Sequence, residues 1–161
     1  MTYLVQLNDE LKVMNVKGEI CLYGGAVMCL VYDARPSTKD VDAVFKPSQD
    51  IRLAVENVAR KNHLRNDWLN DAVKGFLTKH EQRILFNWPN LKVFVPDPDY
   101  LLAMKVFASR VDTTDKKDIQ LLIQKMGIKE PKEVFDILEE YYHKKWIKPA
   151  VQFFIEELFG K

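Results

Sequence analysis

Apolar residues recur along the chain with two different periods, which separate predicted helices from predicted strands. Apolar positions three to four residues apart are typical of one face of a helix, whereas short apolar runs between turn residues are typical of buried strands. The short runs predict strands over residues 19–23, 39–45, 83–88 and 91–95. The longer period predicts helices over residues 3–16, 26–33, 48–61, 66–76, 100–109, 115–126, 131–145 and 149–158. Strands that occur early and are followed by helices alone predict an α/β (α+β) fold with a helical C-terminal part.

Prolines mark the ends of several of these segments. Pro36 prevents the second helix from continuing, because a residue before proline disfavours the helical conformation. Pro131 and Pro149 fall at first-turn positions, where a missing N–H is tolerated. Because the chain has no repeat and no flexible linker, we expect one domain of 161 residues. In it, an α/β core of residues 1–97 carries the helical part of residues 98–161, packed on the core.

Composition and charge narrow the classes of function. The chain has 24 Lys and Arg against 23 Asp and Glu, so only a local basic patch could hold a nucleic acid. No apolar run approaches the roughly 20 residues that span a bilayer, and no signal-peptide pattern opens the sequence. We therefore expect no membrane contact and a cytoplasmic location. Cys21 and Cys29 lack the spacing of a zinc or redox pair and are expected to be buried free thiols.

The strongest candidate for chemistry combines a Gly-Gly turn with two aspartates. Gly24 and Gly25 follow the strand predicted over residues 19–23 and open an apolar helix, so their N–H groups can approach a phosphate. Asp40 and Asp42 stand two residues apart on a predicted strand, where alternate side chains share a face. Two such carboxylates repel each other unless a divalent cation lies between them, which predicts a Mg²⁺ site. The alternative is an ordinary turn and a solvated pair of aspartates at a strand edge.

Three residues between the glycines and the aspartates are further candidates for phosphate contacts. Arg35 could clamp a phosphate through its planar guanidinium, and Ser37 and Thr38 could donate hydroxyl hydrogen bonds. The alternatives are a surface salt bridge for Arg35 and turn chemistry beside Pro36 for the two hydroxyls.

Most of residues 18–120 resemble a known family. The string Gly24-Gly25, a spacer, and Arg35-Pro-Ser-Thr-Lys-Asp-Val-Asp42 resembles the core signature of the nucleotidyltransferase superfamily. It is most similar to the AbiEii-like branch of bacterial toxin–antitoxin nucleotidyltransferases. Residues 68–76, Lys105 and residues 110–115 resemble the later part of small relatives of that branch.

The resemblance implies a small mixed sheet flanked by helices and a transfer reaction. A nucleoside monophosphate would pass from an NTP to a hydroxyl of RNA, protein or a small molecule, with one or two Mg²⁺ ions held by Asp40 and Asp42. A toxin–antitoxin or phage-defence setting, with tRNA or a partner protein as acceptor, is implied by the same branch. The second interpretation is a catalytically inactive module of the same fold that binds a nucleotide, RNA or a protein. The sequence names neither the NTP nor the oligomeric state.

Active members of the superfamily complete their metal site with a third carboxylate, usually from a later strand. The expected strand here, residues 91–95, contains no acidic residue. Asp97 is the nearest substitute and Asp99 the second. Three alternatives stay open: Asp97 is the third ligand, the site works with two carboxylates, or catalysis has been lost. A simple turn and helix cap at Asp97 is equally consistent with the flanking prolines.

Lys105 interrupts a helix that is apolar on nearly all sides, so its ammonium must reach solvent, a carboxylate or a phosphate. The family resemblance favours a place near the triphosphate, and the alternative partners are Asp112 or Asp40. Asp115 and Asp118 follow three residues apart, and the acidic residues here either cap a helix or position Lys105 or Arg110.

Two local basic patches are candidates for RNA contact. They are residues 60–65 and residues 144–148, the second interleaved with aromatic residues. Aromatic residues at helical spacing are more often part of a core.

Overall fold

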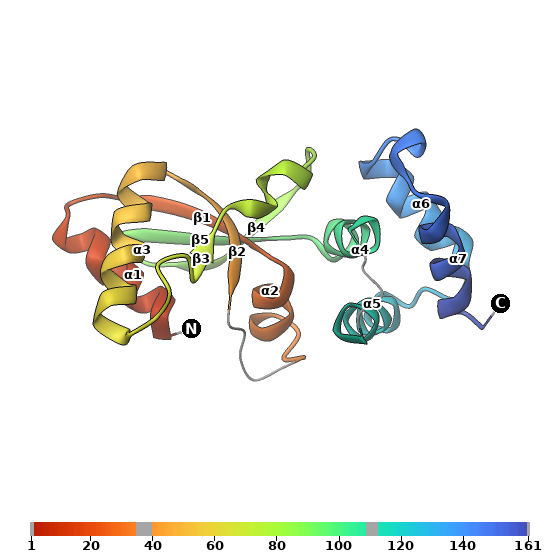
Figure 1. The fold of residues 1–161 in the computed structure, drawn as a ribbon, viewed down its shortest axis with the longest axis horizontal. Coiled ribbons are helices and arrows are strands. Elements are labelled where there is room, and N and C mark those ends of the chain that lie inside the picture. The colour runs from red at the N-terminus through yellow and green to blue at the C-terminus, as the bar shows by residue number, and fades with distance from the viewer. Residues whose placement is uncertain (1, 35–39, 109–112, 161) are drawn as a thin grey trace. The chain divides into compact units, whose positions relative to one another are not determined.

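The computed structural model describes residues 2–34, 40–108 and 113–160, and the chain divides into two compact units (Figure 1). The first unit comprises Met1–Gly75 and Gln82–Pro96. The second comprises Phe76–Glu81 and Asp97–Lys161. A division after Pro96 lies one residue from the subdivision expected from the sequence, although the short segment 76–81 belongs to the second unit. That the two parts pack into one domain stays a prediction.

Within the described residues, a five-stranded mixed sheet forms the centre of the first unit. Its strands are β1 (Gly18–Tyr23), β2 (Val41–Lys46), β3 (Leu69–Asn70), β4 (Gln82–Asn87) and β5 (Leu91–Pro96). They lie in the order β3-β2-β1-β5-β4, with β1 antiparallel to β2 and parallel to β5. β3 runs parallel to β2, and β4 runs antiparallel to β5. The expectation of an α/β fold with a small mixed sheet is confirmed.

Helices α1 (Thr2–Val13) and α3 (Ser48–Asn62) lie side by side and pack against each other and the sheet (Figure 1). α3 contacts β2, and α1 contacts β5. A Cβ on Gly18 would stand only 2.9 Å from Cδ1 of Ile51 and 3.2 Å from Cδ1 of Leu11. A glycine at this position therefore lets the start of β1 approach both helices closely.

The two faces of the sheet differ in burial. Ile20 and Leu22, two residues apart on β1, are fully buried. Cys21 lies between them and is paired with Val44 on β2 and Phe94 on β5, which are only half-buried. Because alternate residues of a strand point to opposite faces, one face forms the core and the other stays partly open.

Helix α2 (Gly24–Leu30) continues directly from β1 and contacts both β1 and β2. Its residues Ala26, Val27 and Met28 are buried, as the apolar sequence predicted. The helix was expected to extend to residue 33, but Asp33 has a φ of 52°, which lies outside the helical region.

The second unit is helical, as expected. It contains α4 (Pro98–Phe107), α5 (Thr113–Met126), α6 (Pro131–Tyr141), a 3₁₀ turn (Lys144–Trp146) and α7 (Pro149–Leu158). α4 contacts the other three helices, and its nearly all-apolar sequence is buried accordingly. Pro131 and Pro149 occupy the first helical turns that were predicted for them.

The prediction of a helix over residues 66–76 is wrong. This segment forms the short strand β3 and a 3₁₀ helix, Ala72–Phe76. The Trp68 indole N–H donates to the carbonyl of Val55 at 2.9 Å, and the Trp68 carbonyl accepts from the N–H of Val41 at 2.7 Å. The Asn70 side chain then accepts from the N–H of Ala72 at 3.1 Å, which starts a turn. These tertiary and turn contacts override a helical spacing of apolar residues.

The helix predicted over residues 131–145 ends early, at Tyr141. Tyr142 is extended, with φ −126° and ψ 134°. Its buried hydroxyl donates to the carbonyl of Phe76 at 3.0 Å. This bond ties the segment 76–81 to the second unit.

Cys21 and Cys29 are free thiols, as predicted, but only Cys21 is buried and Cys29 is half-buried. Nowhere in the described part of the chain is a helix both long and apolar enough to cross a membrane.

Candidate functional site

Gly24 and Asp42, which are 18 positions apart in sequence, lie in close contact. Gly24 has a φ of +58°, a conformation that residues with a side chain rarely adopt. A Cβ built on it would stand 3.1 Å from Oδ2 of Asp42. Glycine is therefore needed at this position for two reasons: the backbone conformation and the close approach of the Asp42 carboxylate.

The strand pairing explains how this contact forms. β1 and β2 are antiparallel, and the last residue of β1, Tyr23, is paired with Asp42 near the start of β2. Since α2 begins at the next residue, the Gly-Gly turn stands at the same end of the sheet as the aspartate strand. The two halves of the sequence motif are thus brought together by sheet register.

Asp42 is half-buried in the row that Tyr23, Asp42 and Asn70 form across β1, β2 and β3. Tyr23 is fully buried, and Asn70 is held in the turn that follows β3. Asp42 consequently has a fixed position within the sheet. Asp40 lies just before the first residue of β2 and is exposed. That both carboxylates share one face stays a prediction.

The candidate phosphate contacts Arg35, Ser37 and Thr38 lie outside the described residues. Gly25 is the second residue of α2 and is half-buried. The roles expected for these four residues at a triphosphate stay predictions.

Asp97 and Asp99 lie at the start of α4, in the second unit. Asp97 is the N-terminal flanking residue of the helix, with φ −66° and ψ 156°, and its side chain makes no capping hydrogen bond. Asp99 accepts a hydrogen bond from the Tyr141 hydroxyl at 2.6 Å. Burial and this hydrogen bond raise the pKa of Tyr141 well above its ordinary value. Asp99 thus has a structural partner, and the role of Asp97 as third ligand stays a prediction.

Lys105 is held by two carboxylates inside the second unit. Its Nζ lies 3.0 Å from Oδ2 of Asp118 and 3.7 Å from Oδ1 of Asp115. The Lys105 and Asp118 side chains are only 10% and 6% exposed, so the ammonium is largely removed from water. Of the two alternatives for these acidic residues, a helix cap or the positioning of Lys105 or Arg110, the structure shows the contact with Lys105 for Asp115 and Asp118. Arg110 and Asp112 lie outside the described residues.

The donor set can be compared with what Mg²⁺ requires. Among the residues described, no three His, Cys, Asp or Glu side chains are grouped so that they could hold a metal ion by themselves. Mg²⁺ is commonly held by one or two carboxylates together with substrate phosphates. Asp42, whose carboxylate lies beside the backbone of Gly24, and the neighbouring Asp40 fit a Mg²⁺ ion that arrives with a triphosphate.

Comparison with curated proteins and with solved structures found no match. A family model described as "Nucleotidyltransferase of unknown function (DUF6036)" matches residues 2–135, from the first residue of α1 into α6. This range includes the Gly24–Asp42 contact and Lys105. The AbiEii-like branch is not singled out by this match. The chain belongs to this family of nucleotidyltransferases of unknown function.

Proposed function

We propose that the protein transfers a nucleoside monophosphate from an NTP to a hydroxyl group, with Mg²⁺ as cofactor. The contact between Gly24 and the Asp42 carboxylate carries the proposal, because it joins a turn able to approach phosphates with a candidate metal ligand. Membership of a nucleotidyltransferase family supports it.

In the proposed reaction, an acceptor hydroxyl oxygen bonds to the α-phosphorus of the NTP while the bond from that phosphorus to pyrophosphate breaks. The hydroxyl proton passes to solvent or to a nearby base. Bound Mg²⁺ would neutralise the phosphate charge that otherwise repels the incoming oxygen.

The residues of the chain have separate tasks in this scheme. Asp40 and Asp42 would hold Mg²⁺, with Asp97 as the candidate third carboxylate. The N–H groups of Gly24 and Gly25 would receive the triphosphate. Arg35, Ser37 and Thr38 are assigned to phosphate contacts by resemblance alone. Lys105 is assigned to the triphosphate in the same way, and its pairing with Asp118 means that it would act as part of an ion pair.

The acceptor is a hydroxyl of RNA, including tRNA, of a protein or of a small molecule. A toxin–antitoxin or phage-defence setting belongs to the proposal through the AbiEii-like resemblance.

A second candidate is a catalytically inactive module that binds a nucleotide or RNA. It is favoured by the sequence of β5, the strand expected to supply a third carboxylate, which contains no acidic residue. Binding of each NTP, measured by calorimetry with and without Mg²⁺, separates the two candidates. NTP binding that depends on Mg²⁺ supports the enzyme candidate, whereas NTP binding that is the same with and without Mg²⁺ supports the inactive binding module.

Incubation of the protein with radiolabelled NTPs, Mg²⁺ and cell RNA or lysate tests the transfer itself. Asp42→Asn should abolish labelling of the acceptor. Asp9→Asn is the matched control, since Asp9 is an exposed carboxylate on α1. If the wild-type protein labels nothing, or Asp42→Asn labels as well as the wild type, the enzymatic proposal is wrong.

A further inference from the structure

A row of polar side chains crosses the sheet at the end opposite Asp42. Glu19 on β1 is paired with Lys46 on β2 and with Lys92 on β5, and Lys92 is paired with Asn87 on β4. Side chains in register on neighbouring strands point to the same face and stand about 5 Å apart. Glu19 lies four positions before Tyr23 on β1, so the row is about 13 Å from the pair Tyr23–Asp42.

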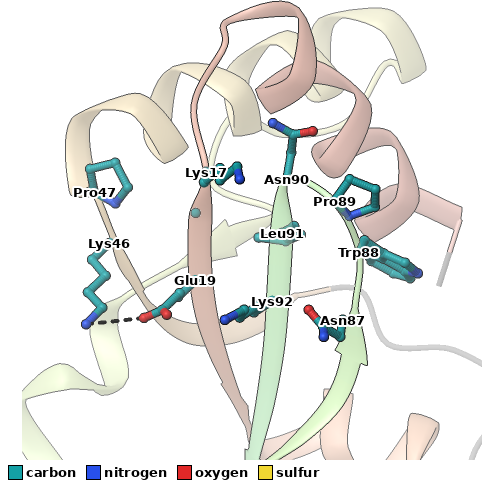
Figure 2. A pocket seen from close by; sticks show the side chains of 11 residues that line it. Lys17, Glu19, Lys46, Pro47, Asn87, Trp88, Pro89, Asn90, Leu91 and Lys92 are labelled. Carbon is teal, nitrogen blue, oxygen red and sulfur yellow. Dashed lines mark ion pairs between the residues drawn. The ribbon is translucent and has the colours of Figure 1, made fainter.

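This row borders a concave surface that we call the lysine groove. Its volume is about 830 Å³, and its polar and aromatic lining residues include Lys17, Glu19, Lys46, Asn87, Trp88 and Lys92. Figure 2 shows the polar side chains of the row next to one another, with Lys17 above them and Trp88 at one side.

The groove carries excess positive charge. Lys46 forms an ion pair with Glu19, with 3.2 Å between Nζ and Oε2. In the part of the chain that the structure describes, neither Lys17 nor Lys92 forms an ion pair, and both are exposed. Three lysines against one glutamate leave a local charge of +2. In a chain whose net charge is only +1, this is a local concentration of the charge that attracts phosphates.

The aromatic residue at the side of the groove is held in place. The Trp88 ring stacks on Phe86, with 4.8 Å between ring centroids and 6° between ring planes. The backbone N–H of Trp88 donates to the Leu91 carbonyl at 3.0 Å, and this bond closes the β4–β5 hairpin. The neighbouring Asn90 donates its N–H to the Asn8 side chain at 2.9 Å and its side-chain amide to the Val16 carbonyl at 3.0 Å. The hairpin tip is therefore anchored to α1 and to the segment before β1.

We propose that the lysine groove binds single-stranded nucleic acid, with backbone phosphates at Lys17, Lys46 and Lys92 and a base at Trp88. Two exposed lysines without an ion pair, a third lysine paired with Glu19 and an aromatic ring that lines the same groove give the cations and the stacking surface that sequence-tolerant binding of single strands uses. A base can reach an aromatic side chain only when it is not paired within a duplex. A site for a free nucleotide would be more enclosed and more apolar than this groove.

The proposal is independent of the proposed transfer reaction, because the groove and Asp42 lie at opposite ends of β1. Asp42→Asn should bind a strand as well as the wild type does. Loss of strand binding without loss of transfer, or the reverse, would identify which of the two proposals fails.

The test measures fluorescence anisotropy of a labelled single-stranded RNA of mixed sequence at several salt concentrations. Lys17→Glu combined with Lys92→Glu should weaken binding on the order of tenfold or more and lower the salt slope by about 1.4, at about 0.7 per phosphate contact. The control is Lys125→Glu with Lys129→Glu, which changes two exposed lysines of the second unit and should leave binding unchanged.

Tryptophan substitutions test the stacking role. Trp88→Ala should weaken binding about fivefold or more, because stacking of a base on an aromatic ring is lost. Trp146→Ala should have no effect, although Trp146 is 58% exposed and lies beside Lys145 in the basic patch of residues 144–148. Thermal melts establish that each variant is folded, and the lysine variants, which change exposed side chains only, keep the test valid if Trp88→Ala unfolds.

Competition identifies the ligand. Unlabelled single strand should displace the probe, whereas inorganic phosphate, a free NTP and poly-glutamate at equal anion concentration should not. The proposal is overturned if the wild-type protein does not bind the strand, or if the Lys17/Lys92 and Lys125/Lys129 double variants weaken binding equally. It is also overturned if Trp146→Ala weakens binding and Trp88→Ala does not. Equal displacement by a free NTP or by poly-glutamate, or equal binding of a duplex, also overturns it.

Discussion

The Oδ2 atom of Asp42 lies 3.1 Å from the position that a Cβ on Gly24 would occupy. Gly24 also has a φ of +58°, so any side chain at this position meets both a strained backbone and a carboxylate. The relationship turns two weak sequence signals, a Gly-Gly pair and an Asp-x-Asp pair, into one local arrangement. A pair of glycine variants tests it separately from the transfer reaction.

Gly24→Ala should destabilise the protein by about 1–2 kcal/mol through backbone conformation alone, and by more once the Cβ displaces Asp42. Gly127→Ala is the matched comparison, since Gly127 has a φ of +69° but nothing within 4 Å of its Cβ position. Urea denaturation gives both free energies of unfolding. Binding of Mg²⁺ with an NTP should be lost in Gly24→Ala and retained in Gly127→Ala. Equal NTP binding by the two variants would show that the Gly24–Asp42 contact does not matter for the site.

The ion pair of Lys105 should be important for the stability of the second unit. Asp118→Ala leaves a nearly buried ammonium without its closest partner, which costs about 3–5 kcal/mol when a buried pair is broken. Asp115→Ala should cost less, because Asp115 is 3.7 Å away and its side chain is 29% exposed. Lys105→Met combined with Asp118→Leu should recover most of the stability. Denaturant titrations that give Asp118→Ala the same stability as the wild type would contradict this assignment.

The double variant also tests the expected phosphate role of Lys105. If Lys105 contacts the triphosphate, Lys105→Met with Asp118→Leu should fold but bind an NTP more weakly. If NTP binding is unchanged in the folded double variant, Lys105 is a structural residue only.

Cys21 should become a source of instability at high pH. Burial raises the pKa of its thiol from 9.0 to about 11, so the folded protein holds this proton more tightly than the unfolded chain does. A raised pKa stabilises the fold below pH 9, and this contribution is lost as the pH rises from 9 towards 11. Cys21→Ala should flatten that part of the stability curve. Iodoacetamide at pH 9 should label the half-buried Cys29 before Cys21. Faster labelling of Cys21 would contradict the burial.

The sequence predicts those features that depend on local pattern. The strand before Gly24, the strand that carries Asp42 and the apolar helix α4 all follow from the spacing of apolar residues. The contact between Gly24 and Asp42 could be expected only after the resemblance had joined the two motifs. Its geometry depends on the register of β1 and β2, which no local pattern contains.

Features that depend on tertiary contacts could not be predicted in the same way. The segment around Trp68 has helical spacing, yet its indole bond to Val55 and its pairing with β2 make it a strand. Asp118 was not among the alternative partners named for Lys105, because only the packing of α4 on α5 brings the two side chains together. The lysine groove was missed because Lys17, Lys46 and Lys92 are far apart in sequence. Their polar positions at strand ends were the available signal, but only the strand order places them together.

The central claim, that the Gly24–Asp42 site transfers a nucleoside monophosphate, is tested most directly by the position of the transferred label. The protein is incubated with Mg²⁺, cell RNA or lysate, and an NTP labelled at either the α- or the γ-phosphate. The account predicts that acceptor molecules gain the α-label and not the γ-label, with pyrophosphate released. Asp42→Asn should reduce this transfer at least about a hundredfold, since loss of a metal ligand removes several kcal/mol of charge stabilisation. Transfer of the γ-label, or α-label transfer that survives Asp42→Asn, would contradict the account.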